Sequence, residues 1–283
     1  MKRIAIQGIQ GSFHDIASHQ FFKGEEIELI TCDSFEQVFE QLRKDEETVA
    51  LVAIENTIAG SLLHNYELLR ESDATIVGEH KLHIEHSLMC LPDESWDNLN
   101  EVNSHPVALM QCREFLSRHP ELKVVEVEDT AGAAANISQK KLKGHAAICH
   151  KDAAKIYNMK VLQEGIETNK HNYTRFLVLA SANKAESLRR IDETNKASMV
   201  FSLSHEEGSL SAVLSVLSFY KLNLTKIQSL PIIGKEWQYL FYIDLKFNDY
   251  IRYRQAINAI APLTEELKIL GEYVASRTDE SSK

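Results

Sequence analysis

The sequence predicts an α/β fold in two parts, because its pattern of apolar residues changes once along the chain. Over residues 1–180, short runs rich in Val and Ile alternate with amphipathic segments, which is typical of βα units on a largely parallel sheet. Beyond residue 195 the expected order becomes βαββαβ, as in ferredoxin-like domains. A length of 283 residues suits about two domains.

In the first part, apolar runs are expected to be strands and the amphipathic segments between them helices. The expected strands cover residues 3–7, 48–54, 82–91, 124–127, 146–149 and 176–179. The expected helices cover residues 12–22, 34–43, 61–71, 106–118 and 130–141. This alternation predicts an α/β architecture.

The second part follows a polar stretch, residues 181–195, which lacks a dense apolar pattern and is expected to be a linker. Two apolar stripes with helical spacing run from Leu210 to Leu217 and from Tyr253 to Ile260. The expected strands cover residues 197–203, 222–230, 237–247 and 269–274, with Gly234 in a turn. The expected domains are therefore residues 1–180 and 196–276, followed by a disordered tail, residues 277–283.

Charge and composition exclude some classes of partner. The formal net charge is −10, and the whole excess lies in residues 1–180, which hold 18 basic and 28 acidic residues. Such a surface repels nucleic-acid phosphates and anionic membranes, so a small molecule or another protein is the expected partner. No segment approaches the ~20 continuous apolar residues of a membrane span. The N-terminus lacks an apolar leader, so a cytoplasmic location is expected.

Cysteine and histidine residues do not form a metal-binding pattern. Cys-x-x-Cys spacing is lacking among the four cysteines, which predicts reduced thiols: Cys32, Cys90, Cys112 and Cys149. His80, His83 and His86 are close in sequence, but the last two would point to opposite faces of one strand. Cys112 follows His105 by seven positions, yet nothing visible would orient a nucleophile there. We therefore expect no metal and, at Cys112, a buried structural thiol.

Four strand-to-helix junctions in the first part are made of small or polar residues. They cover residues 7–12, 55–61, 103–106 and 129–132. Their Ser, Thr, Asn and Asp residues suit helix caps, Pro106 suits a first helical turn, and the glycines permit tight turns. Helix starts at the carboxyl ends of strands also present N–H groups to anionic ligands. For these junctions, caps and anion sites both remain open interpretations.

A hydroxyl lies beside a guanidinium in Asn172-Tyr173-Thr174-Arg175-Phe176, just before an expected strand. The planar fork of an arginine can bind a carboxylate with two hydrogen bonds. A single Thr-Arg pair is nevertheless more often a surface feature than a site. The surrounding strings decide how it is interpreted.

Four strings in order give the chain a specific resemblance. They are I-E-N-T-I-A-G-S (54–61), S-H-P-V-A-L-M-Q-C (104–112), D-T-A-G-A-A (129–134) and N-Y-T-R-F-L-V-L (172–179). Together they resemble the prephenate dehydratase family, and N-L-T-K-I (223–227) resembles part of an ACT regulatory domain. The resemblance implies a catalytic domain of two α/β lobes with a cleft, similar to periplasmic binding proteins. It also implies a homodimer or homotetramer formed through ACT domains.

The implied activity is that of a carbon–oxygen lyase, the decarboxylative dehydration of prephenate to phenylpyruvate on the route to L-phenylalanine, without a cofactor. The resemblance makes Thr174 and Arg175 the catalytic pair, with Thr174 assisting departure of the ring hydroxyl. It implies that substrate is bound by Ser12, Asn56, Thr57, Gly60, Ser104, His105, Thr130, Ala131, Asn172 and Phe176. It implies that L-phenylalanine, as effector, is bound near Gly208, Ser209, Leu210, Asn223, Leu224 and Thr225.

Both parts depart from the family pattern. Ile9 replaces a proline of the first motif, and His14 replaces a small hydroxyl residue. We interpret His14 as a helix-surface histidine, with a titrating group near the cleft as the alternative. Gln228 and Leu230 replace a Glu and an Arg of the phenylalanine-sensing motif, so altered inhibition is expected. Arogenate dehydratase and a non-enzymatic cytoplasmic ligand sensor remain alternative functions.

Overall fold

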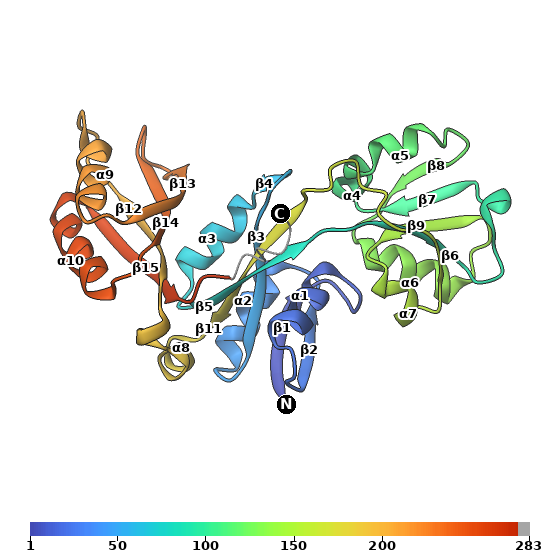
Figure 1. Ribbon diagram of the computed structural model, residues 1–283, viewed down its shortest axis with the longest axis horizontal. Coiled ribbons are helices and arrows are strands. Elements are labelled where there is room, and N and C mark those ends of the chain that lie inside the picture. Colours follow the sequence, from blue (N-terminus) through green and yellow to red (C-terminus); the bar gives the residue numbers. More distant parts are fainter. Residues whose placement is uncertain (277–283) are drawn as a thin grey trace. The chain divides into compact units, whose positions relative to one another are not determined.

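The computed structural model describes residues 1–276 (Figure 1). These residues form two compact units. Unit 1 comprises Met1–Val38, Leu51–Leu62 and Lys81–Phe176. Unit 2 comprises Phe39–Ala50, Leu63–His80 and the chain from Leu177 onward. The predicted α/β class is confirmed. The expected disordered tail, residues 277–283, lies outside the described residues.

A five-stranded sheet in unit 1 has the order β10-β6-β9-β7-β8. Its strands are β6 (Ser87–Cys90), β7 (Glu101–Ser104), β8 (Lys123–Glu126), β9 (His145–Cys149) and β10 (Lys160–Gln163). The pairs β7–β8 and β7–β9 are parallel, whereas β6 pairs with β9 and β10 in antiparallel fashion. The helices of this region are η1 (Trp96–Asn98), α4 (Pro106–Gln111), α5 (Arg113–Ser117), α6 (Thr130–Lys140) and α7 (Asp152–Ile156).

Strand β9 shows why this sheet is buried on both faces. Successive strand side chains point to opposite faces. Ala146 and Ile148 pack in the core cluster that contains Leu109 of α4, while Ala147 packs with Ile137 of α6. The apolar run is therefore continuous, as expected for a strand with helices on both sides.

The remaining strands of unit 1 belong to the other sheet, where neighbouring strands follow the order β11-β3-β1-β2 and β4 pairs with β3. Their bounds are β1 (Lys2–Gln7), β2 (Ile27–Cys32), β3 (Val49–Asn56), β4 (Gly60–Ser61) and β11 (Tyr173–Ala180). Strands β1 and β2 are parallel, and helix α1 (Phe13–Phe21) connects them. Strands β3, β11 and β5 (Thr75–His83) contribute residues to both units.

Unit 2 contains the predicted βαββαβ order, which is confirmed, in an antiparallel sheet β13-β14-β12-β15. Its elements are β12 (Lys196–Ser202), α9 (Ser209–Phe219), β13 (Asn223–Pro231), β14 (Tyr239–Lys246), α10 (Tyr250–Ile260), η3 (Ala261–Leu263) and β15 (Glu266–Tyr273). Val213 and Leu217 of α9 share a core with Tyr253 and Ile257 of α10. The two predicted apolar stripes are therefore the core faces of these helices.

The rest of unit 2 precedes this sheet in the chain. It includes most of α2 (Phe35–Lys44), α3 (Leu63–Glu71), α8 (Ala182–Leu188) and η2 (Ile191–Glu193). Gly271 of β15 pairs with Ile76 of β5. A Cβ atom at Gly271 would lie 2.3 Å from the Ile76 carbonyl oxygen, so only glycine permits this close approach.

Several predicted elements differ from the structure. The strand expected at 82–91 is the end of β5 followed by β6, because Ile84 donates to the Asn172 carbonyl and His86 accepts from the Ile166 N–H between them. The helix expected at 106–118 is divided at Cys112 into α4 and α5. The expected linker, residues 181–195, contains α8. Strands β2, β5, β7 and β10 were not predicted over most of their length.

None of the described helices has the length and apolar character needed to cross a bilayer.

Candidate functional site

The junction after β3 is a hairpin rather than a direct entry into a helix. Asn56 ends β3, and its Oδ1 accepts from the N–H groups of Ile58 (2.9 Å) and Ala59 (2.8 Å), which closes a tight turn. Gly60 of β4 follows with a φ of 83°, and it pairs with Asn56 of β3. The helix expected from residue 61 begins only at Leu63. The prediction for this segment was therefore wrong in its first residues.

Two of the predicted motifs meet at this hairpin. Asn56 Nδ2 donates to Asn172 Oδ1 (2.8 Å) and to Thr174 Oγ1 (3.0 Å). Thr57 N–H donates to the Tyr173 carbonyl (2.9 Å), and Tyr173 N–H donates to Thr57 Oγ1 (2.9 Å). These bonds join residues more than 110 positions apart, so the fold brings four predicted site residues together: Asn56, Thr57, Asn172 and Thr174. Asn172 is fully buried, whereas Thr174 is half-buried.

Thr174 and Arg175 offer different chemistry from adjacent positions of β11. The Thr174 oxygen accepts from Asn56, so its own hydroxyl proton can be donated to a bound molecule. Arg175 is only 8% exposed, and its guanidinium lies 3.9 Å from Glu55 Oε2 of β3. A buried guanidinium beside a carboxylate is held in place, and its N–H donors form a planar fork.

The helix starts at the other junctions are capped by their own residues. Ser12 Oγ accepts from Asp15 N–H (3.3 Å) at α1, and Asp15 Oδ2 accepts from Gly11 N–H (2.7 Å). His105 Nδ1 accepts from Val107 N–H (3.2 Å) at α4. At each of these starts the cap interpretation is therefore confirmed for the N–H groups named.

Asp129 caps α6 and was not among the predicted site residues. Its Oδ1 accepts from Gly132 N–H at 2.5 Å. Burial raises the pKa of the Asp129 carboxyl, although its bonds to backbone N–H groups and the nearby His105 oppose that rise. The D-T-A-G string carried a cap signal, but burial and pKa depend on the fold.

The turn at residues 7–12 packs against Asp129 and Tyr157. A Cβ atom at Gly8 would lie 3.4 Å from Ser12 Oγ and 3.5 Å from Asp129 Oδ2, and the φ of Gly8 is 96°. Tyr157 OH donates to the Gln10 carbonyl at 2.5 Å. Ser12 and Asp129 are therefore close, although 117 positions separate them in the sequence.

Other predicted site residues lie in the interior. Ser104 is fully buried, and its hydroxyl donates to the Ile148 carbonyl at 2.5 Å. Ala131 is fully buried as well, and Thr130 is 9% exposed. Phe176, which the resemblance implied to bind substrate, is 1% exposed and therefore fills the core.

His14 does not lie on a helix surface, so that interpretation was wrong. It is 9% exposed, and its Nε2 accepts from Ala53 N–H at 3.3 Å. Burial lowers the pKa of His14 to about 4. The prediction of an exposed His14 failed because five consecutive residues of α1 are buried, including the polar Asp15 and Ser18. This part of the helix therefore has no exposed polar face on which His14 could lie.

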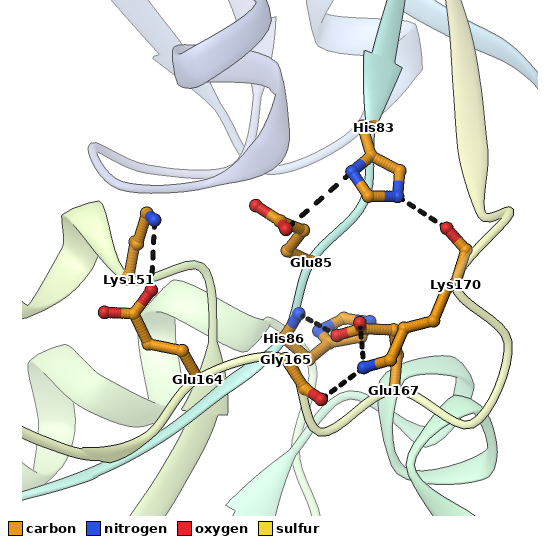
Figure 2. A network of polar contacts seen from close by, with 8 residues as sticks. All are labelled: His83, Glu85, His86, Lys151, Glu164, Gly165, Glu167 and Lys170. Carbon is orange, nitrogen blue, oxygen red and sulfur yellow. Dashed lines mark hydrogen bonds and ion pairs between the residues drawn. The ribbon is translucent and has the colours of Figure 1, made fainter. Parts of the chain in front are cut away.

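A polar network joins the two chain segments that connect the sheets of unit 1 (Figure 2). His83 Nε2 contacts the Lys170 carbonyl at 2.7 Å, and His86 N–H donates to Glu167 Oε2 at 2.9 Å. Lys170 Nζ bonds Glu167 Oε1 at 2.6 Å. His86 Nε2 instead contacts Gln111 Oε1 at 2.9 Å. His83 and His86 therefore bind separate partners.

The four cysteines are all buried and free. Burial raises the pKa of the Cys112 and Cys149 thiols, which keeps them protonated and unreactive. The interpretation of Cys112 as a structural thiol is therefore confirmed.

The residues expected to bind an effector lie in unit 2. Gly208 caps α9 with φ of 82°, and Ser209 and Leu210 form the first turn. Asn223, Leu224 and Thr225 begin β13, where Thr225 Oγ1 donates to the Asp244 carbonyl at 3.3 Å. Leu210 lines an open pocket along α9 together with Ser211, Leu214, Ser215, Ser218 and Phe219.

Comparison with known proteins identifies the family. The model of the prephenate dehydratase family matches residues 4–184. The chain belongs to the prephenate dehydratase family. The predicted family and the predicted enzyme class, a lyase, are thereby confirmed.

Relatives of known name agree with this placement. Arogenate dehydratase 1 of Petunia hybrida is 34% identical, over 98% of this chain and 68% of that protein. The bifunctional chorismate mutase/prephenate dehydratase of Escherichia coli is 32% identical, over 96% of this chain and 70% of that protein.

Solved structures of similar fold include members of the same family. Prephenate dehydratase of Arthrobacter aurescens, solved in complex with L-Phe, has a TM-score of 0.86 and 25% identity, over 98% of this chain and 91% of that one. A quorum quenching acylase, GqqA, has a TM-score of 0.85 and 26% identity, over 97% and 98% of the two chains.

Proposed function

We propose that this protein converts prephenate to phenylpyruvate with Thr174 and Arg175 as its catalytic pair. The observation that carries the proposal is the 3.0 Å bond from Asn56 Nδ2 to Thr174 Oγ1. Because Asn56 Nδ2 donates a hydrogen bond to the Thr174 oxygen, the hydroxyl of Thr174 is oriented to donate its own hydrogen bond elsewhere. A departing hydroxyl group on the substrate is a suitable acceptor.

The proposed reaction needs little covalent help from the protein. The bond from the ring to its carboxylate breaks, its electron pair enters the ring, and the hydroxyl on the opposite side leaves as carbon dioxide is released. The ring becomes aromatic, which supplies the driving force. A hydrogen bond from Thr174 stabilises the negative charge that develops on the departing oxygen, which leaves as hydroxide and becomes water by taking a proton from solvent.

Arg175 is proposed to bind a carboxylate of the substrate. Its guanidinium is fixed by burial and by Glu55, so little side-chain entropy is lost when a carboxylate binds. The first 180 residues carry the whole net negative charge of the chain, which opposes long-range attraction of a dianion. Substrate binding must therefore depend on short-range contacts of this kind.

We propose that residues 1–180 form a catalytic domain of two lobes with a cleft, that residues 181–195 connect it, and that residues 196–276 form an ACT regulatory domain. The βαββαβ order supports the last assignment. L-phenylalanine is the proposed effector, supported by the A. aurescens relative in complex with L-Phe. Gln228 and Leu230 are proposed to alter its affinity.

Association into a homodimer or homotetramer is proposed to use the regulatory domain. Support comes from α9, where Phe219 is 81% exposed at the edge of the open pocket. An apolar side chain so exposed is typical of an association surface. A cytoplasmic location remains part of the proposal.

One assay tests the function. Purified protein is given prephenate or arogenate, and phenylpyruvate or phenylalanine is measured with and without added L-phenylalanine. We expect phenylpyruvate from prephenate. Preferential turnover of arogenate would favour the Petunia relative's activity, and turnover of neither would favour a ligand sensor. Tight phenylalanine binding by calorimetry with ordinary inhibition would contradict the altered effector site.

A further inference from the structure

The side chain of His14 contacts two neighbouring strands of one sheet, β3, which carries Asn56, and β11, which carries the proposed catalytic pair. It belongs to α1, it is 9% exposed, and it contacts β3 through a hydrogen bond and β11 through its ring. A histidine in such a position is costly to bury unless its polar atoms have partners. Its contacts therefore indicate what it does.

The contact with β3 is polar. Ala53 N–H donates to His14 Nε2 at 3.3 Å. A ring nitrogen that accepts a hydrogen bond carries no proton, so the neutral ring has its proton on Nδ1. Burial lowers the pKa of His14 to about 4, so the ring is neutral near pH 7.

The contact with β11 is an aromatic one. The His14 ring meets the Phe176 ring edge to face, with centroids 5.0 Å apart and planes at 82°. A second ring, Phe35, lies on the His14 ring at a centroid distance of 5.6 Å. Edge-to-face pairs of this kind stabilise a specific packing geometry.

The positions of these two contacts along the strands connect His14 to the site. Ala53 precedes Glu55 and Asn56 on β3, and Phe176 directly follows Arg175 on β11. One rigid ring thus contacts both strands within three residues of the Asn56–Thr174 bond. A relative shift of the two strands would lengthen that bond.

We propose that His14 is a positioning residue for the reaction, because it holds β3 and β11 where Asn56 can orient the Thr174 hydroxyl. This inference rests on the proposed function. His14 does not touch the reacting atoms. A displacement of about 1 Å at a catalytic group can lower a rate up to 10²-fold, so its effect is expected in kcat rather than in KM.

The test compares variants that keep or lose the acceptor. His14→Leu and His14→Asn lose it, the second because its side chain is too short to reach Ala53, whereas His14→Gln can offer an amide oxygen. We expect kcat to fall about tenfold or more in the first two, with KM within about twofold, and to recover most of its value in His14→Gln. Folded fraction is measured by circular dichroism at the assay temperature.

Phe35→Leu is the matched control. Phe35 contacts the His14 ring but belongs to α2, so its loss reduces packing without removing the Ala53 bond. We expect kcat within about twofold of the original value for this variant. Hydrogen exchange adds a readout independent of turnover: the Ala53 amide should exchange faster in His14→Leu and His14→Asn than in His14→Gln.

Three results would overturn the inference. They are an unchanged kcat in folded His14→Leu or His14→Asn, an equal loss in Phe35→Leu, or no recovery in His14→Gln. If the original protein turns over neither prephenate nor arogenate, the proposed function fails instead. Even if neither substrate is turned over, an unchanged hydrogen-exchange rate of the Ala53 amide in all variants would overturn the positioning role of His14.

Discussion

The strand ends of β3 and β11 differ from the helix starts of α1, α4 and α6 in where their polar side chains bond. At the strand ends, Asn56 bonds Asn172 and Thr174, more than 110 residues away. At the helix starts, Ser12, His105 and Asp129 bond N–H groups two or three residues away. Both regions contain Asn, Asp, Ser, Thr or His, and the resemblance implied substrate-binding residues in each.

The difference teaches that residue type does not separate a cap from a site. A bond to the next turn stabilises one helix and leaves the rest of the fold unaffected. A bond across the fold places two distant groups in fixed geometry, which is what a reaction needs. Substitutions in the first region should therefore change rates, and substitutions in the second should change stability.

The largest effect is expected at Thr174. Thr174→Ala removes the hydroxyl that assists the leaving group, and such assistance typically contributes 10²- to 10⁴-fold. We expect kcat for phenylpyruvate formation to fall by about that factor, with a smaller change in KM. Thr174→Ser keeps the hydroxyl and serves as control. An unchanged kcat in Thr174→Ala would remove the basis of the comparison.

Lower pH should reduce the free energy of unfolding through His14, which lies in the buried part of α1 and not at its capped start. The folded pKa is about 4, below the usual 6.5, so the unfolded chain binds the proton first. Stability should fall as pH drops from 6.5 toward 4, by up to about 3 kcal/mol, and level off below. Urea unfolding at several pH values measures this. His14→Gln should lack this contribution, and an equal slope in it would contradict the assignment.

Substitution of Arg175 by Lys should mainly weaken substrate binding. Lys keeps the charge but lacks the planar fork, and charge-assisted hydrogen bonds are worth about 1.5–3 kcal/mol. We expect KM to rise about tenfold to a hundredfold. Arg113→Lys, on helix α5, is the matched control and should leave KM unchanged. A fall in kcat alone would assign Arg175 to the chemical step instead.

Loss of the α6 cap should act on stability. Asp129→Ala removes the acceptor for Gly132 N–H, and such a loss costs about 1 kcal/mol of unfolding free energy. Asp129→Asn keeps a capping oxygen and should retain most of that stability. We expect kcat within about twofold for both folded variants. A large fall in kcat for Asp129→Asn would show that this helix start belongs with the catalytic strand ends.

The smallest effect is expected from salt. Because residues 1–180 carry the whole excess of negative charge, they repel a dianionic substrate at long range. Screening should slightly raise the association rate, measured by stopped flow as ionic strength increases. A marked fall would mean that a local positive field at the site dominates.

The sequence pattern predicted an element well where a single local feature, such as the spacing of apolar residues, determines that element. The stripes in α9 and α10 predicted buried faces because helical spacing alone brings those residues to one side. The short strand β7 escaped prediction because its four residues, E-V-N-S, include only one apolar residue, whereas the equally short β8 contains two adjacent valines and was predicted. His14 was misplaced because its burial depends on Phe35, Ala53 and Phe176, which lie elsewhere in the chain.

The sequence by itself determined the α/β class, the βαββαβ order and the motifs of the family, since these depend on local periodicity and residue identity. The tertiary structure alone decided which polar residues meet. Asn56 and Thr174 come together, and Asp129 turns to its own helix, because a hydrogen bond requires atoms within about 3 Å. Contacts at that distance between remote residues exist only once the chain has packed.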